Sequence, residues 1–374
     1  MNRAPGHLLS RGPGHLLSQA AGRVMSGAAG FFKRLEDVLN AAAGKPEFRA
    51  GRLFIHRAGL SLLIGTGVAL FAFFGASCRS SVPLQIFYRP PGTTVEVYKS
   101  RPVALELVVY PPPAGPARGA VIFIHGGGWS VAGAGIPTYQ DWHGPLREAG
   151  LRAFALEHRV PPRYRGRDHI NDCVDAVRYI ERNAERFGFP ADRMALVGFS
   201  SGGHLAVMTG LSLSRPRPGL RSLAGAGPVR AVVAYYAPLD PERLLEDTTN
   251  PDLREVLVNY LPRYSAAPIN GATDANQLSA LRRSFYERAL ADISPMRHVH
   301  AFAPRMFLLH GVADELIPVD QSRAFRDRAN TVKPGVARLL EIERGDHHFI
   351  RSRSLWARAA DWAALEFIEA QLDD

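Results

Sequence analysis

The sequence predicts an α/β protein with one mostly parallel sheet and helices on both of its faces. From about residue 92 onward, strand-like segments alternate with helical ones, which is the order expected of strands joined by crossover connections. Several of the strand-like segments are continuous apolar runs, as expected for strands buried on both faces. The predicted strands are 95–98, 103–110, 120–125, 151–157, 194–198, 229–236, 306–310 and 337–342.

The local pattern of each segment supports this assignment. The strand 103–110 alternates apolar and polar side chains and ends at three prolines, Pro111 to Pro113. The segment 170–187 has apolar residues at helical spacing. Further helices are predicted at about 202–213, at 321–329 and at 354–372.

An insertion interrupts the alternation at residues 241–295, which contain polar and proline-rich stretches and two helical patterns. A segment of that length between strands is typical of a cap over a site at the carboxyl edge of a sheet. The sequence therefore predicts one domain over residues 79–374 with a small cap inserted in it.

The composition is that of a globular protein, with 46% hydrophobic and 21% charged residues. The formal charge of +10 is uneven, because residues 1–57 contain nine Lys or Arg and three acidic residues. A basic segment followed by an apolar run favours a membrane as partner over nucleic acid. Residues 1–57 are predicted to form a basic, partly disordered N-terminal segment.

Residues 58–78 are predicted to cross a membrane, because these 21 positions contain no charged side chain. A helix of that length spans about 30 Å, the thickness of a bilayer core. The positive-inside rule then places the N-terminus in the cytoplasm and residues 79–374 outside, on the periplasmic side of a bacterial inner membrane. The alternatives are a buried core helix, a signal peptide, and a lipoprotein that carries its lipid on Cys78.

A candidate nucleophile lies in Gly198-Phe-Ser200-Ser-Gly202, where a buried strand turns directly into a helix. So tight a turn strains the backbone of the serine, and side chains at the two glycine positions would clash. The turn exposes the Ser200 hydroxyl above the sheet, and the helix N-terminus behind it favours developing negative charge. The alternative is an ordinary glycine-rich turn.

A glycine loop, His125-Gly-Gly-Gly-Trp129, follows another buried strand. Three glycines allow the backbone to approach a ligand closely, so its N–H groups can point at a substrate oxygen. The N–H groups of Gly127, Gly128 and Ser201 are predicted to form an oxyanion hole. We expect a structural role for His125 and a place beside the pocket for Trp129. The loop lacks the Lys-Ser/Thr ending of a P-loop.

A serine hydroxyl needs a histidine as base, and the histidine needs a carboxylate to orient it. After a strand-to-helix serine turn, the order along the chain is serine, acid, histidine. Asp314 follows the strand 306–310, which places it at the same edge of the sheet as Ser200. Glu315 and Asp320 are less well placed, because a helix begins there. The alternative for Asp314 is a helix cap.

The histidine is expected directly after the last strand, where His347 and His348 are adjacent. Their position alone leaves both open. No metal or organic cofactor is needed by a serine, histidine and aspartate mechanism. The two cysteines, Cys78 and Cys173, form neither a disulfide framework nor a Cys-x-x-Cys metal pattern, so no metal site is predicted.

These motifs together resemble the hormone-sensitive-lipase-like and feruloyl-esterase-like (BD-FAE-like) carboxylesterases of the α/β-hydrolase superfamily. The glycine loop, the serine turn and the segment from His310 to Asp314 match in order and spacing, and the match covers about residues 92–374. The segment Asp292-Ile-Ser-Pro also resembles one that those enzymes carry before the strand of the acid. Their histidine usually lies in Gly-x-His-x-Phe, which favours His347.

One segment departs from the family pattern. Glu157-His158-Arg159 stands where such enzymes more often have Asn-Tyr-Arg. We expect the change to affect the packing beside the glycine loop and not the three catalytic side chains.

The resemblance implies an α/β-hydrolase fold and a serine carboxylic-ester hydrolase that acts on a small-molecule ester through an acyl-enzyme. Ser200, Asp314 and His347 are the expected catalytic residues. Two alternatives stay open: an amidase, formamidase or peptidase of the same fold, and a non-catalytic, membrane-anchored binding domain. The sequence does not indicate the acyl length or the oligomeric state.

Overall fold

The computed structural model describes residues 90–131, 140–215, 227–260, 287–352 and 354–373. All of them belong to the unit Pro83–Asp374, the second of two compact units in the chain. The predicted N-terminal segment 1–57, the predicted span 58–78 and Cys78 lie outside the described residues. Within the described part of the chain, no helix is both long and apolar enough to cross a membrane.

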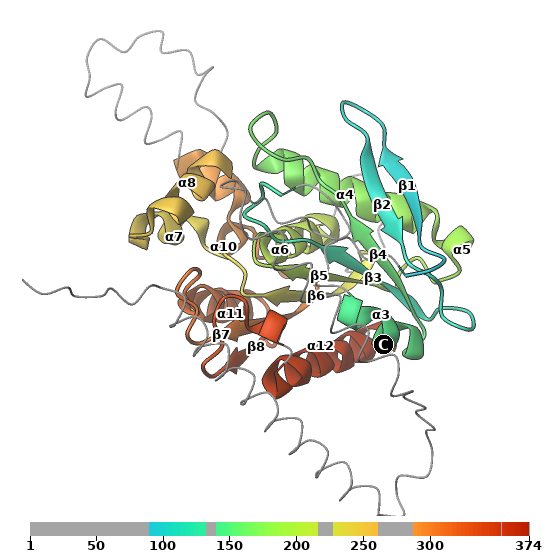
Figure 1. The fold of residues 1–374 in the computed structure, drawn as a ribbon. Helices are drawn as coiled ribbons and strands as arrows, with labels where there is room; N and C mark the ends of the chain where they lie inside the picture. Colours follow the sequence, from blue (N-terminus) through green and yellow to red (C-terminus); the bar gives the residue numbers. More distant parts are fainter. Residues whose placement is uncertain (1–89, 132–139, 216–226, 261–286, 353, 374) are drawn as a thin grey trace, which may run out of the picture. The chain divides into compact units, whose positions relative to one another are not determined.

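Eight strands form a single sheet (Figure 1). They are β1 Thr94–Lys99, β2 Leu105–Val109, β3 Gly119–Ile124, β4 Leu151–Leu156, β5 Met194–Phe199, β6 Val229–Tyr235, β7 Arg305–Gly311 and β8 Ala337–Ile342. Their order is β1-β2-β4-β3-β5-β6-β7-β8, with β2 antiparallel to both of its neighbours and all pairs from β4 to β8 parallel. The predicted, mostly parallel sheet is confirmed, and the predicted strand ends agree within two residues.

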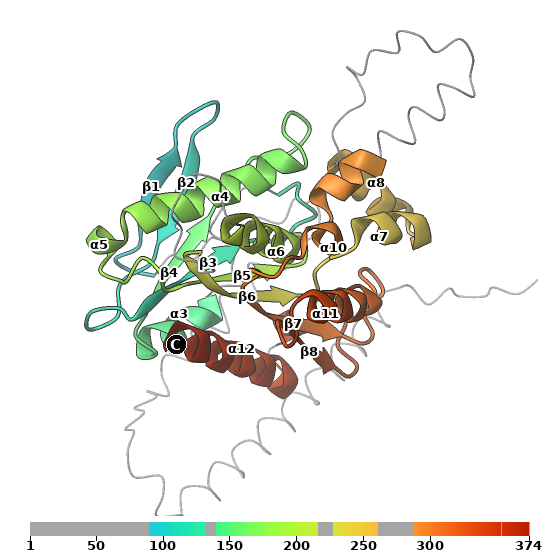
Figure 2. The ribbon, with the colours of Figure 1, turned by 180° about the vertical axis from the view of Figure 1, so that it is seen from behind.

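The sheet is buried on both faces because helices cover each of them. The described helices are α3 Gln140–Glu148, α4 Arg167–Arg182, α5 Ala184–Phe187, α6 Ser201–Ser214, α7 Pro241–Asp247, α8 Pro251–Tyr260, α10 Pro295–His298, α11 Asp320–Val332, α12 Leu355–Asp373 and the 3₁₀ helix η3 Phe349–Ser352. Helices α4, α6 and α11 pack on one face, and α3 and α12 pack on the other (Figure 2).

Strand β3 shows why the apolar run is continuous. Ile122 and Ile124 point into the core cluster that contains α4 and α6. Val121 and Phe123 point into the opposite cluster, with α3 and α12. Alternate side chains of a strand face opposite sides, so a strand between two helical layers needs apolar residues at every position.

Two helices differ from the sequence-based prediction. The predicted helix 170–187 is divided into α4 and α5 at Asn183, whose backbone (φ −109°, ψ 13°) is not helical. Helix α3 was not predicted, because Gly144 and Pro145 interrupt its pattern. Trp142 and Leu146, four residues apart, are both buried, so packing of one side of α3 outweighs the poor propensity of the glycine and the proline.

The described part of the insertion lies beside the glycine loop. The Tyr260 ring at the end of α8 stacks on the Trp129 ring with 4.2 Å between centroids. Val256, one turn earlier, lies 3.0 Å from where a Cβ on Gly128 would stand. Helix α8 therefore packs against the loop after β3, at the carboxyl edge of the sheet. Residues 261–286 of the predicted cap lie outside the described residues.

Candidate active site

Ser200 is the residue between β5 and α6, and its backbone has φ 52° and ψ −123°. Few residues other than glycine adopt a positive φ, so this conformation is strained. The two glycines of the turn are required by close backbone contacts. A Cβ on Gly198 would lie 2.1 Å from the Gly202 carbonyl oxygen, and a Cβ on Gly202 would lie 2.2 Å from the Ile124 carbonyl oxygen.

The three predicted catalytic side chains are joined by hydrogen bonds. The Ser200 Oγ lies 3.0 Å from Nε2 of His347, and Nδ1 of His347 lies 2.8 Å from Oδ2 of Asp314. An ionised carboxylate only accepts, so Nδ1 of His347 carries the proton and donates it. Nε2 is then free to accept the Ser200 hydroxyl proton, which is the orientation that a general base requires.

Asp314 follows β7, and its carboxylate accepts three hydrogen bonds and contacts a second histidine ring. Its Oδ1 accepts hydrogen bonds from the backbone N–H groups of Leu316 and Ile317, at 3.0 and 2.8 Å. Its Oδ2 faces the rings of His347 and His310. Burial raises the pKa of the Asp314 carboxyl, but the bonds from His310 and His347 outweigh burial and lower that pKa to about 2. The carboxylate is therefore ionised at neutral pH.

The tertiary structure distinguishes the two adjacent histidines. His347 is buried between Ser200 and Asp314, and its ring lies 4.8 Å from that of Tyr236. His348 is exposed, and its backbone N–H donates to Oδ1 of Asp346. Of the pair, His347 is the one brought to the serine. Glu315 and Asp320, the weaker acid candidates, are exposed.

The glycine loop passes directly beside Ser200. A Cβ on Gly126 would lie 2.6 Å from the Phe199 carbonyl oxygen and 3.3 Å from the Ser200 Cβ. Gly127 and Gly128 have φ +120° and +60°, which L-residues adopt at a cost. Ser201 begins α6, so its N–H has no partner four residues earlier in the helix and lies at the positive end of the helix dipole. The loop and the helix start thus meet at the serine.

His125 is held within the loop. Its Nδ1 donates to the Gly126 carbonyl oxygen at 3.0 Å, and its ring stacks on that of His158, 4.5 Å away. Burial lowers the pKa of His125 to about 3, so the ring is neutral at physiological pH. His158, one of the two positions that depart from the family pattern, thus contacts the glycine loop through His125.

Trp129 connects the loop to its surroundings. Its Nε1 donates to Nδ1 of His204 on α6 at 3.3 Å, and its ring stacks on Tyr260. His204 in turn donates from Nε2 to the Ile293 carbonyl oxygen at 2.7 Å. Trp129 therefore links the glycine loop, the helix behind the serine and the insertion.

Three residues beside the site were given no role by the sequence reasoning: His204, Tyr260 and His310. Tyr260 and His310 are far from Ser200 in sequence. No local motif marks Tyr260, and His310 opens the segment that leads to Asp314. Tyr236 follows β6 and has φ 39°, which is strained for a tyrosine. His204 carried a usable signal, since a histidine one helical turn after the serine faces the same side of α6.

Among the residues that the structure describes, no three His, Cys, Asp or Glu side chains are placed to hold a metal ion.

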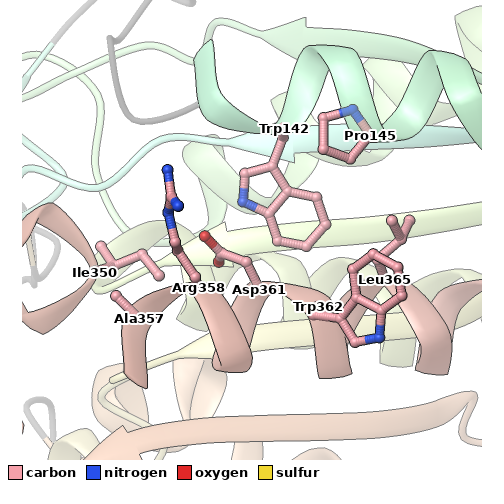
Figure 3. A pocket seen from close by; sticks show the side chains of 8 residues that line it. All are labelled: Trp142, Pro145, Ile350, Ala357, Arg358, Asp361, Trp362 and Leu365. Atoms are coloured by element: carbon pink, nitrogen blue, oxygen red, sulfur yellow. The ribbon is translucent and has the colours of Figure 1, made fainter. Parts of the chain in front are cut away.

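A cavity of about 330 Å³ lies between α3 and α12, and the candidate catalytic side chains do not line it (Figure 3). Trp142 from α3 faces Asp361 and Leu365 from α12 across it, and Ile350 closes one end. Neither Ser200, Asp314 nor His347 lines this cavity, so it is distinct from the candidate active site.

A sheet of this order, with a strained serine between a central strand and the next helix, is the α/β-hydrolase fold. Solved structures agree. Esterase 2 of Thermogutta terrifontis phosphonylated by sarin matches with a TM-score of 0.58 and 25% identity over 76% of this chain and 97% of that chain. A truncated carbohydrate esterase from gut microbiota matches with a TM-score of 0.56 and 21% identity, over 75% and 97%.

The chain belongs to the BD-FAE family, whose sequence model matches residues 107–328. Esterase LipC of Mycobacterium tuberculosis is 29% identical over 61% of this chain and 52% of its own length. The probable carboxylic ester hydrolase LipM of the same organism is 30% identical over 60% and 48%. The chain thus spans about half the length of these curated relatives. The resemblance to BD-FAE-like carboxylesterases is confirmed.

Proposed function

We propose that this protein is a serine-dependent carboxylic ester hydrolase. The observation that carries the proposal is the pair of hydrogen bonds from Ser200 to His347 and from His347 to Asp314, at 3.0 and 2.8 Å. This arrangement on a strained turn between strand and helix is what activates a serine as a nucleophile. The names of the relatives, esterases and a carboxylic ester hydrolase, support the same class of reaction.

In the first half of the reaction, Nε2 of His347 takes the hydroxyl proton while Oγ of Ser200 attacks the acyl carbon. Asp314 holds the ring in place and stabilises the imidazolium that forms. The resulting oxyanion is placed on the N–H groups of Gly127, Gly128 and Ser201, each of which contributes about 3 kcal/mol of transition-state stabilisation in comparable sites. His347 then donates its proton to the leaving alkoxide, and the acyl group remains on Ser200.

In the second half, water replaces the alcohol. His347 takes a proton from water, and the hydroxide attacks the acyl carbon of the ester on Ser200. The intermediate collapses, His347 returns the proton to Oγ, and the carboxylic acid leaves. Every proton that His347 takes is returned, so the enzyme ends in its starting protonation state.

The test is hydrolysis of a short series of p-nitrophenyl esters by the full chain and by Ser200→Ala. We expect activity that falls about 10,000-fold in the variant, because the nucleophile is lost while the fold remains. A p-nitroanilide of the same acyl group separates an esterase from an amidase. Equal activity in both proteins would mean that Ser200 is not the nucleophile. A fluorophosphonate that labels the wild-type chain but not Ser200→Ala gives an independent measure of the reactive serine.

We further propose that residues 58–78 anchor the protein in a membrane with residues 79–374 on the far side from the N-terminus. The support is the absence of charge over 21 positions and the basic segment before them. Extraction of bacterial membranes with alkaline carbonate tests the anchor, and a reporter fused after Asp374 tests the side. Release of the full chain by carbonate would exclude a spanning helix.

A further inference from the structure

A second buried histidine, His310, faces the same carboxylate oxygen as His347. His310 lies near the end of β7 and Ser322 in the first turn of α11, and both are fully or almost fully buried. Nε2 of His310 lies 3.3 Å from Oδ2 of Asp314, the oxygen that holds His347. Neither residue belongs to the mechanism described above.

The hydrogen bonds of His310 define its tautomer. Nε2 lies 2.8 Å from the Ile317 carbonyl oxygen, which can only accept, so Nε2 carries the proton. Nδ1 is then an acceptor, and the Ser322 hydroxyl, 2.7 Å away, is its donor. The Nε2–H donates to Ile317, and Nε2 lies 3.3 Å from Oδ2 of Asp314, close enough for its proton to attract that carboxylate oxygen. Ser322 thus stabilises the tautomer that directs a proton at Asp314.

These contacts form one continuous chain of side chains: Ser322, His310, Asp314, His347 and Ser200. Oδ1 of Asp314 is occupied by two backbone N–H groups, so His310 and His347 share the charge of Oδ2. A donor on that oxygen reduces the negative charge that His347 experiences and prevents the carboxylate from turning away.

We propose that His310, with its tautomer set by Ser322, is a positioning residue that tunes the base His347 through Asp314. The proposal rests on the proposed function for its catalytic meaning. Loss of the His310 donor leaves more negative charge on Oδ2, and this charge stabilises the imidazolium form of His347. A base that holds its proton more tightly is neutral, and therefore active, only at higher pH.

The nearby ionisable groups are the same in every variant of the test. The rings of Tyr236 and His348 lie 4.8 and 5.1 Å from that of His347. Near His310, Glu341 of β8 pairs with Arg323 of α11. A change in titration can then be assigned to His310.

The test is the pH profile of kcat/KM for p-nitrophenyl butyrate, with the full chain and five variants: His310→Met, His310→Gln, Ser322→Ala, Ser322→Thr and the double variant of His310→Met and Ser322→Ala. Active sites are counted with a fluorophosphonate. His310→Met removes the donor, and we expect the acid limb to move up by about half a pH unit or more. His310→Gln keeps an N–H near the position of Nε2, and we expect its acid limb to lie at the wild-type pH.

Ser322 supplies the sharper test. Ser322→Ala moves the acid limb in the same direction as His310→Met but less, and Ser322→Thr, which keeps the hydroxyl, leaves it in place. Because Ser322 acts only through His310, Ser322→Ala has no further effect in the His310→Met background. An acid limb that stays unchanged in His310→Met, or fully additive effects of the two substitutions, would overturn the proposal.

A readout without catalysis separates this proposal from the proposed function. The low-field proton resonance of the His347 Nδ1–H is followed against pH in Ser200→Ala protein, with and without His310→Met. We expect the midpoint to move up in the absence of the His310 donor. If the wild-type chain hydrolyses no ester but the midpoint moves, the positioning role holds and the proposed function fails. If His310→Met does not fold, the same comparison with Ser322→Ala decides, and an unmoved midpoint contradicts the proposal.

Discussion

At the scale of single residues, the candidate site depends on a glycine, because a Cβ at that position would clash with the backbone. A Cβ on Gly126 would lie 2.6 Å from the Phe199 carbonyl oxygen and 3.3 Å from the Ser200 Cβ. The first of these contacts is to backbone, which cannot move aside as a flexible side chain would. The loop that contains Gly127 and Gly128, the proposed oxyanion donors, therefore passes this close to the serine only because residue 126 has no side chain.

Gly126→Ala tests this dependence. We expect kcat/KM for a p-nitrophenyl ester to fall about 100-fold, the effect of displacing an oxyanion donor. Gly115→Ala is the matched control, since a Cβ there meets nothing within 4 Å, and its activity and melting temperature should equal those of the wild type. Full activity in Gly126→Ala would show that the loop can shift without consequence.

At the scale of elements, the stabilisation that an apolar side chain provides depends on whether it packs on the sheet. Helix α12 shows this clearly, because its ends differ in environment. Ile368 is fully buried in the cluster beneath the sheet, whereas Leu355 at the start of the helix is 82% exposed. Two aliphatic side chains of the same size thus contribute differently to the stability of one helix.

Ile368→Ala should lower the free energy of unfolding by about 2–5 kcal/mol, because a cavity is left in the core. Leu355→Ala should change it by less than about 0.5 kcal/mol, since its side chain already contacts water. Urea unfolding followed by circular dichroism measures both. Similar values for the two variants would mean that α12 does not pack on the sheet as described.

At the scale of the whole molecule, buried neutral histidines make stability depend on pH. Burial lowers the pKa of His125 to about 3, and lowers those of His158, His169 and His204 to about 4. In the unfolded chain each has a pKa near 6.5. As pH falls below about 6.5 the unfolded chain binds protons that the folded chain does not, so stability is lost down to about pH 4.

Each such histidine can contribute up to about 1.4 kcal/mol per pH unit to this loss. We expect the melting temperature to fall markedly between pH 7 and pH 5. His158→Tyr introduces the residue that similar enzymes more often carry here. It should reduce the slope of the free energy of unfolding against pH by about one proton. Scanning calorimetry at several pH values checks this, and equal slopes for the two proteins would contradict it.

Much of the fold was predictable, because apolar runs and turn residues are local features. All eight strands were found, and Ser200 and Asp314 were chosen from their positions at strand ends. Helix α3 was missed, since its glycine and proline have low helix propensity and the segment is helical because it packs on the sheet. The division between α4 and α5 at Asn183 was missed for a similar reason, as the apolar spacing continues across it.

The sequence by itself determined the mostly parallel sheet, the strained serine turn and the glycine loop, because each follows from residues close together along the chain. The positions of His347 and His348 left both open and the family pattern favoured His347; the tertiary structure brings the His347 ring to Ser200, since adjacent residues on a loop point in different directions. It also decided that His310 and Ser322 lie behind Asp314, and that Tyr260 covers Trp129. The contacts of His347 with Ser200 and of Tyr260 with Trp129 join segments far apart in the chain, and those of His310 depend on how α11 packs against β7, so only the packing of the sheet and its helices brings these groups within hydrogen-bonding or van der Waals distance.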